Sequence, residues 1–79
     1  MNKRLKNVLA DVFGLKESYI HLQVKKNEVA NWDSLKQMDL VMTLEREYSI
    51  TLEITDIIKM QSIKSIVEVL LEKGVELGD

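Results

Sequence analysis

Cysteine and proline are both absent from this chain, and histidine occurs only once, at His21. Without cysteine the chain has neither a disulfide bond nor a thiolate metal site. A single histidine leaves little for metal binding or for a Ser–His–Asp arrangement. The sequence also lacks a Gly-rich phosphate loop and a paired-histidine motif. These absences argue against an enzyme, and we expect no metal site.

Long apolar runs are missing too. The charged start of the chain, Met1–Lys6, is not followed by a stretch apolar enough for a signal peptide or a transmembrane helix. We therefore expect a cytoplasmic protein without stable membrane insertion, or an organelle-matrix protein if a transit peptide was removed. With 46% hydrophobic and 30% charged residues, the 79 residues suit a single globular domain spanning 1–79.

Charge is unevenly distributed along the chain. Residues 1–32 hold six basic and three acidic side chains, whereas residues 33–56 hold six acidic and only two basic ones. Such an acidic block repels nucleic acid and favours a partner with a basic surface. A DNA-binding helical domain is therefore a poor hypothesis, since the sequence also lacks a basic recognition helix.

The spacing of apolar residues predicts an all-α fold. We expect a four-helix bundle with three longer helices, one short helix and a long first loop. The helices are predicted at about 2–13, 33 or 34–48, 53–59 and 62–73. Asn2 and Ser62 are suitable N-caps, and Gly14 and Gly74 are suitable helix ends.

The same spacing predicts which side chains form the core. The residues expected to be most costly to truncate are Leu5, Phe13, Val41, Leu44, Ile57, Ile66 and Leu70. The broad apolar face of the second helix is predicted to comprise Leu35, Met38, Val41, Met42 and Leu44, with Leu40 beside it. The short helix is predicted to bury Ile54, Ile57 and Ile58, and the last helix Ile63, Ile66, Val67 and Leu70.

Residues 15–33 fit neither helical nor strand periodicity. A connection this long is usually functional or disordered. Its five large apolar residues argue for order, so we expect a loop held against the bundle, with one short turn near Ser18–Leu22.

The most informative stretch is Asn31-Trp32-Asp33-Ser34-Leu35. Taken alone, an Asp-Ser pair before an apolar helix indicates an N-cap. Ser34 and Gln37 even have the spacing of a capping box. From these residues alone, a purely structural role for Ser34 remains open.

The wider pattern resembles the acyl carrier protein family. Asp33-Ser34-Leu35, the Leu40–Glu45 run, Tyr48, the segment 54–60 and the start of the last helix at Ser62 all match it, over essentially the whole chain. The resemblance implies a 4′-phosphopantetheine arm on Ser34, added from coenzyme A by a phosphopantetheinyl transferase. The arm of such a carrier, which is not itself an enzyme, bears acyl or aminoacyl groups as thioesters. Partners would be acyl-transferring, acyl-activating or condensing enzymes in fatty-acid, polyketide or related biosynthesis.

The resemblance also implies roles for neighbouring residues. Asp33 matches a transferase contact, although it can cap the helix as well. Residues matching the partner-binding face are Leu35, Met38, Asp39, Glu45 and Glu47, and docking through such exposed charges would be weak and salt-sensitive. Core packing remains an equal alternative for Leu35, and Met42 could be either core or partner-facing. We expect a monomer.

Three residues depart from the family pattern. Lys36 and Arg46 stand where acidic residues are frequent, and Trp32 adds a large apolar group beside the expected arm. These differences favour a specialised stand-alone carrier over the housekeeping fatty-acid carrier. The alternative is a carrier-like helical adaptor that is not modified and binds a partner helix through its grooves.

Overall fold

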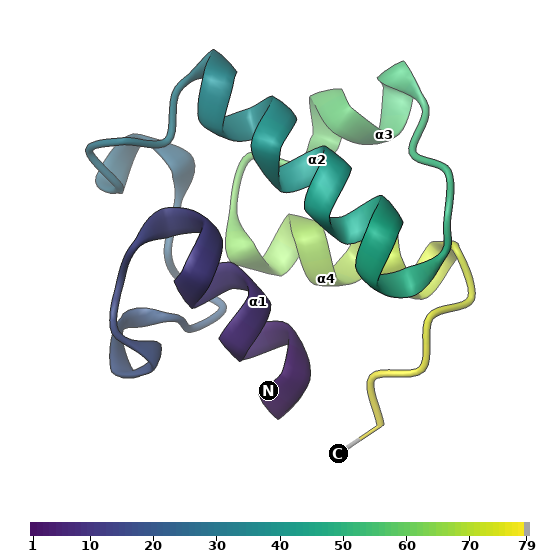
Figure 1. Ribbon diagram of the computed structural model, residues 1–79, viewed down its shortest axis with the longest axis horizontal. Coiled ribbons are helices and arrows are strands. Elements are labelled where there is room, and N and C mark those ends of the chain that lie inside the picture. Colours follow the sequence, from purple (N-terminus) through teal and green to yellow (C-terminus); the bar gives the residue numbers. More distant parts are fainter. Residues whose placement is uncertain (79) are drawn as a thin grey trace.

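A computed structural model describes residues 1–78. The helices are α1 (Lys3–Phe13), the short 3₁₀ turns η1 (Glu17–Tyr19) and η2 (Lys26–Glu28), α2 (Ser34–Tyr48), α3 (Ile54–Lys59) and α4 (Ile63–Glu72). Figure 1 shows α2 running diagonally across the view, with α3 above it and with α1 and α4 below it. The predicted all-α class, the order of the helices and the short third helix are confirmed. Within residues 1–78, no helix is long and apolar enough to cross a membrane.

The predicted helix ends are correct because they depend on local chemistry. Asn2 Oδ1 accepts the Leu5 N–H at 2.9 Å, and Ser62 Oγ accepts the Ser65 N–H at 3.0 Å. Gly14 and Gly74 have φ angles of +65° and +85°, the left-handed conformation that glycine adopts without strain.

The core lies between the inner faces of α1, α2 and α4. Six of the seven residues predicted to be most costly are buried, and the seventh, Ile57, is half-buried. Val69 rather than Val67 completes the inner face of α4, since Val67 is half-buried. The side chains that are most completely buried are Leu5, Leu9, Leu40, Leu44, Met60, Ile63, Ile66 and Leu70.

The predicted apolar face of α2 was wrong in part. Its buried stripe is Gln37, Leu40, Val41 and Leu44, spaced i, i+3, i+4 and i+7. Apolar residues occur around most of this helix, and only one stripe can face the core. Leu35, Met38 and Met42 are therefore exposed, which removes the core-packing alternative for Leu35 and Met42.

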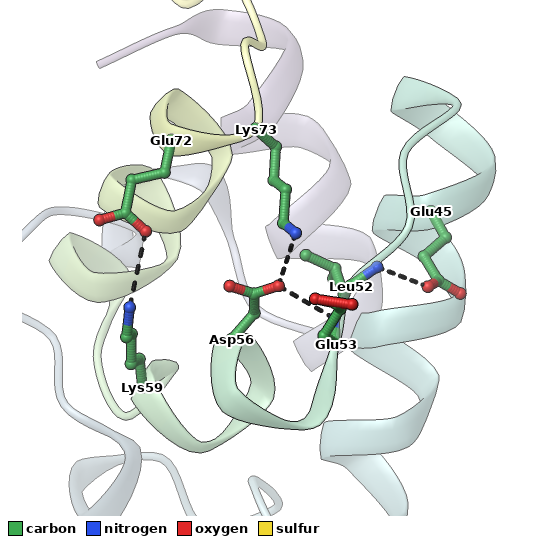
Figure 2. Close-up of polar contacts among 7 residues, drawn as sticks. All are labelled: Glu45, Leu52, Glu53, Asp56, Lys59, Glu72 and Lys73. Atoms are coloured by element: carbon green, nitrogen blue, oxygen red, sulfur yellow. Dashed lines mark hydrogen bonds and ion pairs between the residues drawn. The ribbon is translucent and has the colours of Figure 1, made fainter.

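The prediction for α3 was also wrong in part. Ile54 and Ile58 are exposed, whereas Asp56 is buried. The Asp56 carboxylate faces inward because it pairs with Lys73 Nζ at 2.7 Å and accepts the Glu53 N–H at 2.9 Å (Figure 2). These contacts fix the rotation of α3 and turn the two isoleucines outward.

The long connection is ordered, as predicted, and is held at three places. Lys26 N donates to Gln61 O, and Ile63 N donates to Val24 O, so the loop pairs with the segment before α4. Asn31 Nδ2 donates to Phe13 O at the end of α1. The short turn η1 lies close to its expected position, but η2 was not predicted.

Candidate functional site

The site is the first turn of α2, where Asp33 and not Ser34 is the N-cap. Asp33 Oδ1 accepts the Lys36 N–H at 2.9 Å, and Asp33 O accepts the Gln37 N–H at 2.8 Å. The capping box that the spacing of Ser34 and Gln37 would allow is therefore not formed. Asp33 has the extended backbone of a cap, and its backbone carbonyl oxygen already accepts the Gln37 N–H that such a box would use.

Ser34 is consequently the first residue inside the helix, and it is exposed. Within residues 1–78 its hydroxyl group makes no hydrogen bond. The first N–H groups of a helix lack intrahelical partners, and this end carries the positive part of the helix dipole. A phosphodiester on Ser34 Oγ would thus be placed where negative charge is favoured, so the residues present fit a phosphopantetheine group.

The other serines of the chain are less suitable. Ser62 caps α4, and its Oγ lies 2.8 Å from the Ser65 hydroxyl, so each occupies the other. Ser49 has a φ of +52° at the C-cap of α2, the negative end of that helix. Ser18 lies in the three-residue turn η1, which is too short to build a comparable dipole.

A buried polar network that the sequence did not reveal lies beneath the start of α2. Gln37 Oε1 accepts the Trp32 Nε1–H at 2.6 Å, and Gln37 Nε2 donates to Ile57 O and Met60 O at 3.1 and 3.2 Å. The ring of Trp32 also packs on Phe13, with centroids 4.5 Å apart. Gln37 therefore joins the loop, α2 and the end of α3. The sequence did contain one signal for this network, because Gln37 lies one turn before Leu40 on the face of α2 that is buried.

Trp32 does not lie beside the attachment point as expected. Only 4% of its surface is exposed, because the indole fills the space between the end of α1 and the start of α2. Trp32 therefore supports the start of α2 from the core side. It is not a group that a partner can touch.

Each predicted acidic docking residue already has a partner inside the chain. Asp39 pairs with Lys36 at 3.6 Å, and Glu47 pairs with Arg4 at 3.8 Å. Glu45 Oε2 accepts the Leu52 N–H at 2.8 Å, which holds the turn after α2 (Figure 2). The structure thus places these carboxylates on α2, as expected, but each already interacts with another group of the chain, and the Glu47 pair joins α2 to α1.

Three side chains with a shifted pKa lie outside this site, namely Asp56, Lys73 and Tyr48. The hydrogen bond from Lys73 lowers the pKa of Asp56 below its ordinary value of 3.8, and the same bond raises the pKa of Lys73. Burial raises the pKa of the Tyr48 phenol, although the nearby Arg4 guanidinium opposes that shift. Across residues 1–78, no three His, Cys, Asp or Glu side chains come together in a way that could hold a metal ion.

Comparison with known proteins agrees with this geometry. A family model described as "Phosphopantetheine attachment site" matches residues 3–70. The chain is also similar to the acyl carrier protein of Petrotoga mobilis, with 27% identity over 71 residues that cover 90% of this chain and 84% of that protein. Since the family model spans the bundle from α1 into α4, this chain belongs to the phosphopantetheine-bearing family of acyl carrier proteins, which are carriers and not enzymes.

Proposed function

We propose that Ser34 is the residue to which 4′-phosphopantetheine is attached, within a single carrier domain formed by residues 1–79. The observation that carries the proposal is the exposed Ser34 hydroxyl at the start of α2, which makes no hydrogen bond to any of residues 1–78. The family model covers this position. Ser34 would hold the group through Oγ.

When bound, the group supplies a terminal thiol that carries acyl or aminoacyl groups as thioesters. The contribution of the chain is to present that arm. Asp33 caps α2 and so leaves the neighbouring hydroxyl free, while Gln37 and Trp32 hold the first turn of the helix from inside. Within residues 1–78 the Ser34 hydroxyl has no hydrogen-bond partner, and the neighbouring Asp33 carboxylate is occupied by the Lys36 N–H, so the modification depends on chemistry that the transferase supplies.

Carriers of this family work with a phosphopantetheinyl transferase and with biosynthetic enzymes. We propose that these enzymes approach the face of α2 that surrounds Ser34, with Asp33 as a transferase contact. The proposed partner-binding residues are Leu35, Met38, Asp39, Glu45 and Glu47. The exposure of Leu35 and Met38 supports a contact role for both.

We further propose that the chain is a specialised stand-alone carrier. Lys36 pairs with Asp39 and so reduces the negative charge next to Ser34, and the basic Arg46 is exposed on the same helix. Polyketide, peptide-synthetase-type, lipid-acylation and cell-wall pathways all use such carriers. Trp32 no longer supports this distinction, because it is buried.

Intact-mass measurement tests the attachment residue. After incubation with coenzyme A and a broad-specificity phosphopantetheinyl transferase, the protein should gain one phosphopantetheinyl group. Ser34→Ala should gain none, whereas Ser18→Ala, which alters another exposed serine, should be modified like the wild type. No mass change under conditions that modify a control carrier would favour the unmodified adaptor instead.

A further inference from the structure

Gln37 places a buried amide one turn after the attachment residue, on the face of α2 that packs on the core. Its Oε1 accepts the Trp32 indole N–H at 2.6 Å, and its Nε2 donates to Ile57 O at 3.1 Å and to Met60 O at 3.2 Å. Burying an amide is unfavourable unless its hydrogen bonds are made, and here both ends of the amide have partners. Gln37 thus cross-links the start of α2 to the end of α3.

The helix α3 is held from its other side as well. Lys73 at the end of α4 pairs with Asp56 at 2.7 Å, and the exposed pair of Lys59 with Glu72 adds a weaker contact at 3.8 Å (Figure 2). The short helix is therefore tied to α2 by Gln37 and to α4 by ion pairs. Moving α3 away from α2 breaks buried hydrogen bonds as well as apolar contacts.

The interior behind Gln37 is filled by side chains. Leu40, Met60 and Ile63 have no exposed surface. A long aliphatic group borne at Ser34 would gain by leaving water for this interior, which lies beneath the same turn of α2. Its entry there would displace the Gln37 amide and leave the Trp32 N–H and two carbonyl groups without partners, and that loss opposes the gain.

The surface outside the network is polar. A hollow of about 440 Å³ is lined by Lys25, Lys26, Asn27, Trp32 and Gln61. It is close to the attachment point, because the Cα atoms of Trp32 and Ser34 are at most about 8 Å apart along the chain. Ammonium and amide groups donate hydrogen bonds to hydroxyl, carbonyl and carboxylate oxygens. A polar acyl group thus has hydrogen-bonding groups within the hollow without any opening of the bundle.

We infer that Gln37 closes the bundle to the cargo, and that the chain carries a short or polar acyl group, which stays outside the helices, and not a long aliphatic one. The inference rests on Ser34 being the attachment residue, and it adds the chemical class of the cargo to the proposed function. Gln37 is a specificity-determining residue in this account. Its removal opens the space between α2 and α3 to an aliphatic chain.

Melting temperatures of loaded proteins test the inference. A broad-specificity phosphopantetheinyl transferase loads the protein from acetyl-, hexanoyl- or decanoyl-coenzyme A, and intact mass confirms each loading. The measured quantity is the melting temperature relative to the acetyl form of the same variant, so that a change in basal stability cancels. The variants are Gln37→Ala and the control Val12→Ala, which truncates a buried side chain of α1 and leaves the Gln37 hydrogen bonds in place.

We expect the decanoyl form of the wild type to melt within about 2 °C of its acetyl form, and the fluorescence of Trp32 to be the same in both. In Gln37→Ala the decanoyl form should melt about 5 °C or more above the acetyl form, because a chain that enters the vacated space stabilises only the folded state. Val12→Ala should behave like the wild type. If Gln37→Ala does not fold, Gln37→Leu removes the same hydrogen bonds while retaining most of the side-chain volume.

Three outcomes would overturn the inference while Ser34 still carries the group. The first is a wild-type melting temperature or Trp32 emission that shifts with chain length, which would place the chain in the core or in the apolar hollow beside Phe13, Leu15 and Val29. The second is a Gln37 variant that does not respond to chain length. The third is a response of Val12→Ala equal to that of Gln37→Ala. A wild type that is not loaded at all would refute the attachment proposal as well.

Discussion

The starts of α2 and α4 use the same residue type in opposite ways. Ser62 is itself the N-cap of α4, and its hydroxyl is occupied by the Ser65 N–H and Oγ. Ser34 lies one residue further into its helix, because Asp33 takes the capping role, and its exposed hydroxyl has no partner among the described residues 1–78. A shift of one residue relative to the cap thus decides whether a serine is structural or available for chemistry.

The comparison extends along both helices. α4 buries Ile63, Ile66 and Leu70 completely and serves as a wall of the core. α2 buries one stripe but exposes Leu35 next to the attachment point. Thus α4 mainly stabilises the bundle, whereas α2 both stabilises it and presents a surface.

Truncating a leucine on each helix should show the largest difference between them. Leu70→Ala removes a fully buried side chain of α4 and should lower the free energy of unfolding by about 2–5 kcal/mol. Leu35→Ala removes an exposed one and should change it by no more than about 0.5 kcal/mol. Urea denaturation followed by circular dichroism measures both. Equal losses in the two variants would contradict the assigned faces.

Removing the hydrogen bonds of Gln37 should have the next largest effect on the free energy of unfolding. Gln37→Leu leaves the Trp32 indole N–H and the carbonyls of Ile57 and Met60 without their partner, which should cost about 1–3 kcal/mol. The fluorescence of Trp32, the only tryptophan, should shift as well. A variant as stable as the wild type would show that the network does not hold the start of α2.

Removing the capping side chains tests the comparison between Ser62 and Ser34 directly. Ser62→Ala and Asp33→Ala each remove an N-cap and should cost about 1 kcal/mol, whereas Ser34→Ala should cost at most a few tenths. Ser62→Ala should still be modified by the transferase. If Ser34→Ala proved as destabilising as Ser62→Ala, Ser34 would be a structural residue.

The smallest expected effect on stability comes from the ion pair between Asp56 of α3 and Lys73 at the end of α4. The pKa of Asp56 is lower in the folded chain than its ordinary value of 3.8, because Lys73 and the Glu53 N–H stabilise the carboxylate. Its contribution to stability is therefore complete above pH 3.8 and is lost as the pH falls below that value. Lys73→Met should reduce the loss of melting temperature between about pH 5 and pH 3. An identical pH dependence in both proteins would contradict this role.

The sequence was sufficient for features that depend on neighbouring residues. The caps Asn2 and Ser62, the left-handed glycines Gly14 and Gly74 and the order of the helices all follow from local chemistry. Helical spacing also identified the core residues Leu5 and Leu44.

Features that depend on contacts across the bundle were not predictable in this way. Ile54 and Ile58 have the spacing of a buried pair, but the partner of Asp56, Lys73, lies 17 positions further along the chain and sets the rotation of α3. Trp32 adjoins the motif in sequence, yet packing on Phe13 places it inside. Asp and Ser are both favoured at the N-cap, so the sequence alone did not show that Asp33 and not Ser34 caps α2.

The most direct test of the central claim is to find which residue of the wild-type protein carries the group after transferase treatment. Peptide mapping by fragmentation mass spectrometry locates it without any substitution. We expect all of it on Ser34 and none on Ser62, although both residues lie at the start of a helix. A group found on Ser62, or on any residue other than Ser34, would contradict the account.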